Sequence, residues 1–145
     1  MFLRIASILC VFLAFSCTKK VTDAAIGGGP MVSTTYGEQA EVIMGSGLTV
    51  TKTPSAFTFM EVVSDSRCPK GVDCIRAGEA IVRVALADGS EQTVEINADS
   101  KQRASFTVPD GSVQIMSLEP YPEARVKIDP ASYRLKVRIV KAAVQ

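Results

Sequence analysis

The segment Tyr133-Arg134-Leu135-Lys136-Val137-Arg138-Ile139 decides the fold class of this chain. Its odd-numbered positions are apolar and its even-numbered positions are basic. A period of two is typical of a β-strand that buries one face and exposes the other. The pleat of such a strand places the side chains of Arg134, Lys136 and Arg138 in one row, about 7 Å apart.

The same period recurs on both sides of this segment, between turns rich in glycine and proline. It predicts further strands at 40–44, 48–52, 56–63, 80–86, 92–96, 105–108, 113–118 and 125–128. No segment predicts a helix. About eight or nine short strands predict an all-β fold, an antiparallel β-sandwich of immunoglobulin-like type, with a small β-barrel as the alternative. We expect residues 37–145 to form this single domain.

The predicted strands 80–86 and 92–96 form a hairpin whose register follows from parity. Val82 and Val94 face the same side only if the numbers of paired residues sum to an even value, which a two-residue loop at Asp88 and Gly89 does not allow. A three-residue loop from Ala87 to Gly89 allows it, with Gly89 in the left-handed conformation. This loop also places Ala80 opposite Ile96.

The N-terminus has the pattern of an export signal. A short basic start is followed by an apolar run from Ile5 to Phe15, which predicts a signal peptide over residues 1–16. The sequence Leu13-Ala14-Phe15-Ser16-Cys17 resembles a bacterial lipobox, which implies that Cys17 carries lipid and becomes the first mature residue. Plain secretion after cleavage near Ser16 is the alternative. Residues 17–36 then predict the lipidated cysteine and a flexible tether, rich in glycine and small residues.

These features predict a location in the bacterial cell envelope. The lipid would attach the protein to a membrane. No aspartate follows Cys17, so resemblance to bacterial lipoproteins implies the outer membrane. We expect the domain to face the periplasm.

Cys68 and Cys74 remain as one pair once Cys10 leaves with the signal peptide and Cys17 carries lipid. In an oxidising exported compartment they predict a disulfide that closes a seven-residue loop. A redox motif is the weaker alternative because it has two residues between its cysteines rather than five. A metal site is also weaker because the chain has no histidine and no second pair of thiols.

Composition excludes several classes of function. The chain of 145 residues has 16 basic and 15 acidic residues, so nothing in its net charge attracts nucleic acid. It has no histidine, which removes most hydrolase triads and zinc sites. No nucleophile elbow, Ser-x-x-Lys motif or phosphate-binding loop is present. We therefore expect a protein that is not an enzyme, with no cofactor and no metal.

Charged residues crowd around the cysteine pair. They form a candidate binding patch, and also a candidate set of turn caps and ion pairs, which we favour. Calcium held by three of the acids is a remote third option, because their spacing matches no calcium loop. The five residues are Asp65, Arg67, Asp73, Arg76 and Glu79.

The cysteine segment resembles an uncharacterised family of small exported bacterial proteins and lipoproteins. The resemblance rests on Asp65-Ser66-Arg67-Cys68-Pro69, on Cys74 followed by Ala77-Gly78, and more loosely on residues 118–122 and the closing strand. It implies an exported location and an all-β fold. Arg76 departs from the pattern, since tryptophan is common at its position.

The basic row Arg134, Lys136 and Arg138 is a candidate contact with an anionic partner. Its alternatives are a solvated strand edge, or a row that faces glutamates on a neighbouring strand.

Together these features predict a lipid-anchored, noncatalytic envelope protein that binds a protein or an envelope component. The alternative is an inhibitor of a secreted hydrolase that presents the stapled loop Cys68–Cys74 or the turn at Tyr121. The candidate binding residues are Arg67, Arg76, Tyr121, Arg134, Lys136 and Arg138.

Overall fold

The computed structural model describes residues 29–98 and 100–142. The predicted signal peptide, Cys17 and the tether up to residue 28 lie outside these residues. The described chain forms nine β-strands and a 3₁₀ turn: β1 Met31–Thr34, β2 Gln39–Ile43, β3 Gly47–Val50, β4 Ala56–Asp65, β5 Glu79–Leu86, β6 Glu91–Asn97, β7 Ser105–Val108, β8 Gly111–Glu119, η1 Pro130–Ser132 and β9 Arg134–Lys141.

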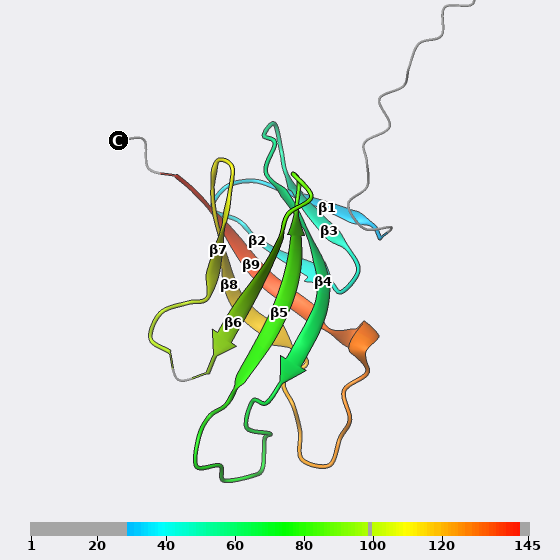
Figure 1. Ribbon diagram of the computed structural model, residues 1–145, viewed down its shortest axis with the longest axis vertical. Coiled ribbons are helices and arrows are strands. Elements are labelled where there is room, and N and C mark those ends of the chain that lie inside the picture. Colours follow the sequence, from blue (N-terminus) through cyan, green and yellow to red (C-terminus); the bar gives the residue numbers. More distant parts are fainter. Residues whose placement is uncertain (1–28, 99, 143–145) are drawn as a thin grey trace, which may run out of the picture.

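The strands form two sheets packed face to face (Figure 1). One sheet has the order β1-β3-β4-β5-β6 and the other the order β2-β9-β8-β7. The two sheets do not close into a barrel within the described part of the chain, so the fold is the predicted sandwich and the barrel alternative is wrong. Every strand pairing is antiparallel except that of β1 with β3, which is parallel.

Strand β9 has the alternation that its sequence predicts. Leu135, Val137 and Ile139 are buried in the core, while Arg134 and Lys136 are exposed. The strand is not at an edge, because it pairs with β2 on one side and β8 on the other. The solvated-edge explanation of the basic row is therefore wrong.

The predicted hairpin is confirmed in its register. β5 and β6 pair Ala80 with Ile96 and Val82 with Val94. Gly89 has a φ of +83°, and its amide donates to the carbonyl of Leu86 at 3.0 Å. A left-handed glycine in a three-residue loop keeps the apolar side chains of both strands on one face.

Two sequence predictions about particular segments are wrong. Residues 31–34, expected in the tether, form β1, so the folded domain begins before residue 37. Residues 125–128, expected as a strand, form an irregular loop, in which Arg125 has a φ of +63° and Val126 is exposed. A strand there would need Val126 and Ile128 buried on one face, and Val126 is not.

Aromatic and branched side chains fill the space between the sheets. Phe57 of β4 and Phe106 of β7 meet edge to face, with ring centroids 5.0 Å apart, and join the two layers. β4 continues below this core to Asp65, where the loop that carries both cysteines begins.

Candidate functional site

Two loops meet at one end of the sandwich, the lower end in Figure 1. We define the loop end as residues 66–78, which connect β4 to β5, together with residues 120–129, which follow β8. Cys68 and Cys74 are joined by a disulfide within the first loop. The amide of Lys70 donates to the carbonyl of Pro122 at 2.9 Å, and the amide of Ala124 donates to the carbonyl of Lys70 at 3.4 Å. Backbone hydrogen bonds therefore tie the stapled loop to its neighbour.

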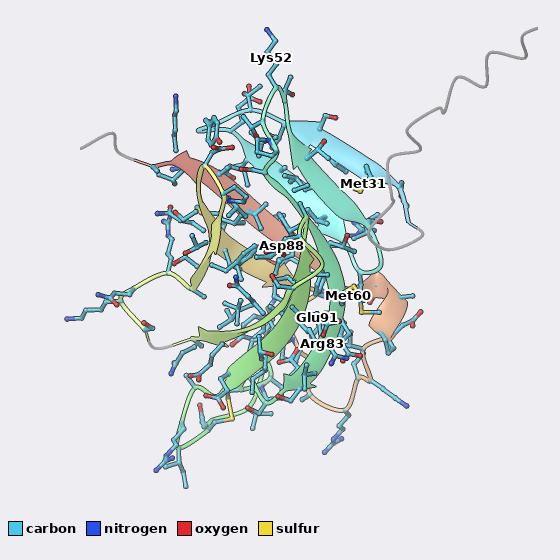
Figure 2. The ribbon with its side chains drawn as sticks, turned by 45° about the horizontal axis from the view of Figure 1, so that its top comes forward. Met31, Lys52, Met60, Arg83, Asp88 and Glu91 are labelled. Carbon is cyan, nitrogen blue, oxygen red and sulfur yellow. A yellow bond between two sulfur atoms is a disulfide. The ribbon has the colours of Figure 1, made fainter. Side chains whose placement is uncertain are left out.

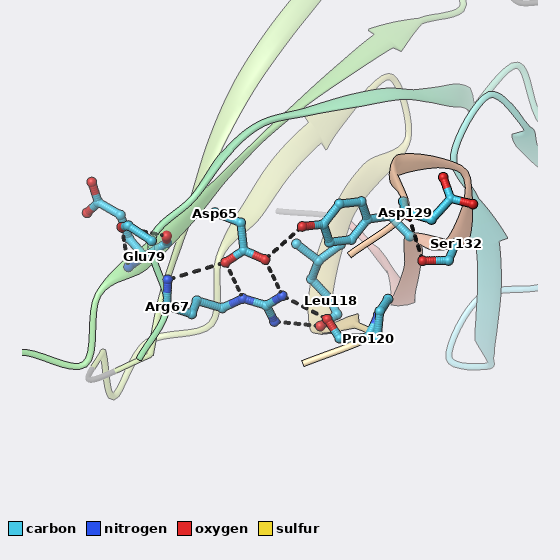
Figure 3. A network of polar contacts seen from close by, with 9 residues as sticks. Asp65, Arg67, Glu79, Leu118, Pro120, Asp129 and Ser132 are labelled. Atoms are coloured by element: carbon cyan, nitrogen blue, oxygen red, sulfur yellow. Dashed lines mark hydrogen bonds and ion pairs between the residues drawn. The ribbon is translucent and has the colours of Figure 1, made fainter. Parts of the chain in front are cut away.

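Arg67 lies beneath both loops and connects them (Figure 3). Its side chain is buried, and its Nη1 donates to the carbonyl of Leu118 at 2.6 Å, while Nη2 donates to the carbonyl of Pro120 at 3.0 Å. Its Nε and Nη2 also donate to the two carboxylate oxygens of Asp65. A guanidinium has five N–H donors in a rigid plane, so one side chain fixes the start of both loops.

Asp65 is held in its charged form by this contact. Burial raises the pKa of its carboxyl, but the hydrogen bonds and positive charge of Arg67, with the hydroxyl of Tyr133, outweigh burial and bring the pKa below 3.8. Tyr133 donates its hydroxyl to Asp65 Oδ2 at 3.0 Å. Burial, then the hydrogen bond and charge of Asp65, raise the pKa of Tyr133 to about 12. The network is therefore an ion pair with a neutral tyrosine attached.

Tyr121 packs against the same guanidinium. The Cζ atom of Arg67 lies 4.9 Å from the centre of its ring, and the Nζ atom of Lys70 lies 5.8 Å from it. These distances suit cation–π contacts. Arg67 and Tyr121, both predicted as binding residues, thus lie together and brace the loops.

Three large apolar side chains of these loops are exposed, among exposed charged neighbours such as Asp73 and Arg125. Ile75 is fully exposed, with a relative exposure of 104%, and Val126 and Val72 are 60% and 47% exposed. Val72 lies within the stapled loop, Ile75 directly follows that loop, and Val126 comes from the second loop. Arg76, another predicted binding residue, is exposed beside Ile75.

The basic row lies on a face of the second sheet, on the strand that follows the second loop. Arg134 forms an ion pair with Glu41 of β2 at 3.6 Å. Lys136 is also in register with Glu41, and Arg138 is in register with Gln39. The predicted alternative that the row faces glutamates on a neighbour is therefore confirmed for Arg134, whereas Lys136 and Arg138 form no ion pair with any described residue.

A cleft of about 240 Å³ opens between β6 and the lower half of β8. β7 pairs with β8 only up to Gln114, so the edge of β8 beyond it is bordered by residues 100–104. Ile96, Ile115 and Leu118 contribute apolar walls, and Arg67 contributes part of the inner end. Arg67 is already bound to Asp65 and two carbonyls, and Glu119 and Arg103 also line the cleft.

Among the described residues, no three acidic or sulfur side chains lie close enough to hold a metal ion. Asp65, the first acid of the calcium option, is bound to Arg67. No helix in the described chain is both long and apolar enough to span a membrane.

Sequence reasoning missed two parts of this site. It did not find the contact of Tyr133 with Asp65, which joins residues 68 positions apart. It also did not single out Val72, Ile75 and Val126. The available signal was an apolar residue flanked by charged ones within a turn-rich segment, as in Cys74-Ile75-Arg76.

Comparisons with known proteins give no relative: no protein-family model, no curated protein and no solved structure matches the chain.

Proposed function

We propose that this protein is a lipid-anchored, noncatalytic binding protein of the bacterial cell envelope, and that it recognises a protein partner through the loop end. The observation that carries the proposal is Ile75, a fully exposed apolar side chain that directly follows Cys74, the second cysteine of the disulfide. A large apolar side chain in water is unfavourable, and contact with a partner removes that cost.

The bracing of the loops supports the same function. Ordering of interface loops is one of the costs that weaken association. Here the disulfide, the contacts of Arg67 and the hydrogen bonds of Lys70 order the loops during folding. A partner would therefore meet loops that are already ordered, with Val72, Ile75 and Val126 exposed on them.

The anchor rests on the N-terminal sequence. Leu13 to Cys17 resembles a lipobox, and the segment from Asp65 to Gly78 resembles a family of exported bacterial proteins. The protein should fractionate with membranes, and Cys17→Ala should release it. A wild-type protein that stays out of the membrane fraction, with a free N-terminus beyond Cys17, contradicts the anchor.

Partner binding is tested by quantitative recovery from cells of tagged wild type, Ile75→Glu and Lys52→Glu. Lys52 lies at the tip of the turn between β3 and β4, at the opposite end of the sandwich (Figure 2). We expect a stoichiometric partner with wild type and with Lys52→Glu, and at least a tenfold loss with Ile75→Glu, because a buried unpaired carboxylate is costly. Equal recovery with Ile75→Glu and wild type contradicts a contact at the loop end.

An inhibitor of a secreted hydrolase is the second candidate. The exposed stapled loop favours it. A rigid loop with a protruding apolar side chain suits the cleft of an enzyme. The two candidates differ in one readout. An inhibitor lowers the activity of the recovered partner in proportion to its dose, and Ile75→Glu removes the effect, whereas a binding protein leaves that activity unchanged.

A further inference from the structure

The two outer faces of the sandwich carry opposite charge. Outward positions of β4, β5 and β6 hold four glutamates and, within these strands, a single arginine: Glu61, Glu79, Glu91, Glu95 and Arg83. Figure 2 shows Arg83 beside Glu91, and Arg83 is ion-paired with both Glu61 and Glu91. A hydrogen bond with Glu95, and then its negative charge, raise the pKa of Glu79, which shows how closely the acids crowd.

The opposite face carries three cations on β9 and two glutamates on its neighbours, Glu41 of β2 and Glu119 of β8. Two of the three cations form no ion pair within the described part of the chain. Lys136 and Arg138 of β9 lie in the middle of the β2-β9-β8-β7 sheet and form no ion pair among the described residues. The Nε atom of Arg138 is buried and has no hydrogen-bond partner there. Glu41, the acid in register with Lys136, is paired with Arg134 instead.

A third cation joins them from a loop. The Nη1 atom of Arg103 lies 3.1 Å from Sδ of Met116. Met116 is the extra residue of a bulge in β8 and precedes Ser117, which pairs with Lys136. Arg103 therefore lies at the edge of β8 beside the row, where it contacts a thioether, a weak acceptor that neutralises no charge. It also borders a hollow that Glu95 of β6 lines.

We propose that this basic face, defined as Arg103, Lys136 and Arg138, docks the domain onto the anionic headgroups of a lipid bilayer. Each arginine or lysine close to an anionic bilayer adds a small favourable term, and several together give measurable binding. The acidic face on the other sheet is repelled by the same surface. The charge distribution therefore selects one orientation, with the basic face toward the lipid.

The inference rests on the proposed function only for the way in which the domain reaches the membrane. An anchored domain is confined near the bilayer, which raises the effective concentration of headgroups and makes a weak contact effective. The contact itself belongs to the sheet face and does not involve the loop end. An experiment can therefore contradict the lipid contact without contradicting the protein contact at the loop end, and the reverse.

The test uses the chain from residue 17 to residue 145 with Cys17→Ser, so that no lipid contributes. Binding is measured by sedimentation with vesicles of phosphatidylcholine, and with vesicles of an equimolar mixture of phosphatidylglycerol and phosphatidylcholine. We expect binding to the mixed vesicles only, with loss of that binding as salt rises from about 0.1 M to about 1 M. Equal binding to both vesicles, or to neither, overturns the proposal.

The triple variant Arg103→Glu, Lys136→Glu and Arg138→Glu should bind the mixed vesicles about a hundredfold more weakly. The matched control is Lys52→Glu, Arg76→Glu and Lys127→Glu, which changes the net charge equally at positions off this face and should lose much less. Equal losses in both variants overturn the proposal, because they show a response to net charge alone.

A glutamine variant and a polyphosphate binding assay complete the test. If the triple glutamate variant unfolds, as seen by circular dichroism, the corresponding triple glutamine variant replaces it and should still bind at least tenfold more weakly. Binding to polyphosphate without binding to the mixed vesicles overturns the lipid assignment in favour of an anionic polymer.

Discussion

Arg67 donates two hydrogen bonds to the carboxylate of Asp65, from Nε to Oδ1 at 2.8 Å and from Nη2 to Oδ2 at 2.6 Å. Both side chains are almost fully buried. The guanidinium also donates to the carbonyl of Leu118, near the end of β8, and to that of Pro120, the first residue of the second loop. One ion pair therefore sets the position of the stapled loop relative to its neighbour.

Replacing Arg67 by methionine should destabilise the domain strongly. The change leaves the carboxylate of Asp65 buried without its partner, and loss of one member of a buried pair costs about 3 to 5 kcal/mol. Urea unfolding measures the loss.

The control for this variant is Arg83→Met. Arg83 and Glu61 form an ion pair on the exposed face, and such pairs contribute about 1 kcal/mol or less. A similar change in unfolding free energy for both variants would contradict the role given to Arg67.

The same network predicts how stability depends on pH. The pKa of Asp65 is lowered by folding, so its contribution is fully present above pH 3.8 and is lost as the pH falls through the lower folded value. The stability difference between wild type and Asp65→Asn should therefore shrink in acid. A difference that stays constant from neutral to acidic pH argues against the ion pair.

The contribution of Tyr133 to stability depends on pH in the opposite direction. Folding raises its pKa from 10.0 to about 12, so its contribution is present below pH 10.0 and is lost as the pH rises through about 12. Phenolate absorbance should include a component at about pH 12 that Tyr133→Phe removes. If the variant retains this component, another group carries it.

Loss of the disulfide should loosen the loop end without unfolding the sandwich, since no strand lies between Cys68 and Cys74. A closed loop of this size contributes about 2 kcal/mol on the chain-entropy formula. Cys68→Ser with Cys74→Ser should lower the unfolding free energy by about that amount, measured in urea, and weaken recovery of the protein partner.

Vesicle binding by the basic face is the internal control for the disulfide variant. It should not change, because Lys136 and Arg138 lie on β9, away from the stapled loop. A loss of both activities would point to general unfolding.

Gly71, within the stapled loop, and Gly78, just before β5, separate the cost of a left-handed backbone from the cost of a steric clash. Gly71 and Gly78 both have positive φ, +80° and +71°. A Cβ at Gly71 meets nothing within 4 Å, whereas a Cβ at Gly78 would lie 1.9 Å from the carbonyl oxygen of Ser66. Gly71→Ala should cost about 1 kcal/mol and Gly78→Ala clearly more, as measured by thermal unfolding. Equal losses of stability in the two variants would contradict the close approach of Gly78 to the carbonyl of Ser66.

How much of the fold the sequence predicts depends on the range of the interactions. The hairpin of β5 and β6 follows from local alternation and one glycine, and its register is confirmed to the residue. β1 was missed because three of its four side chains are exposed. It pairs in parallel with β3, from which β2 separates it in the chain. Exposed positions leave no alternation to detect.

The candidate site shows the same division. The disulfide and the ion pair of Arg67 with a nearby carboxylate could be predicted from neighbouring residues, since Asp65, Arg67 and Cys68 are close in the chain. The second loop could not, because its contacts with Lys70 and Arg67 are long-range. The alternation of Val126 and Ile128 suggested a strand, but the structure places these residues in a loop tied to residue 70.

The central claim, that a protein partner contacts the loop end, is tested most directly by site-specific photocrosslinking in living cells. A photoreactive amino acid is placed at Ile75 in one protein and at Lys52 in another, and the crosslinked products are identified by mass spectrometry. We predict one abundant protein adduct from position 75 and none of that adduct from position 52. The same adduct from both positions, or no protein adduct from position 75, would contradict the claim.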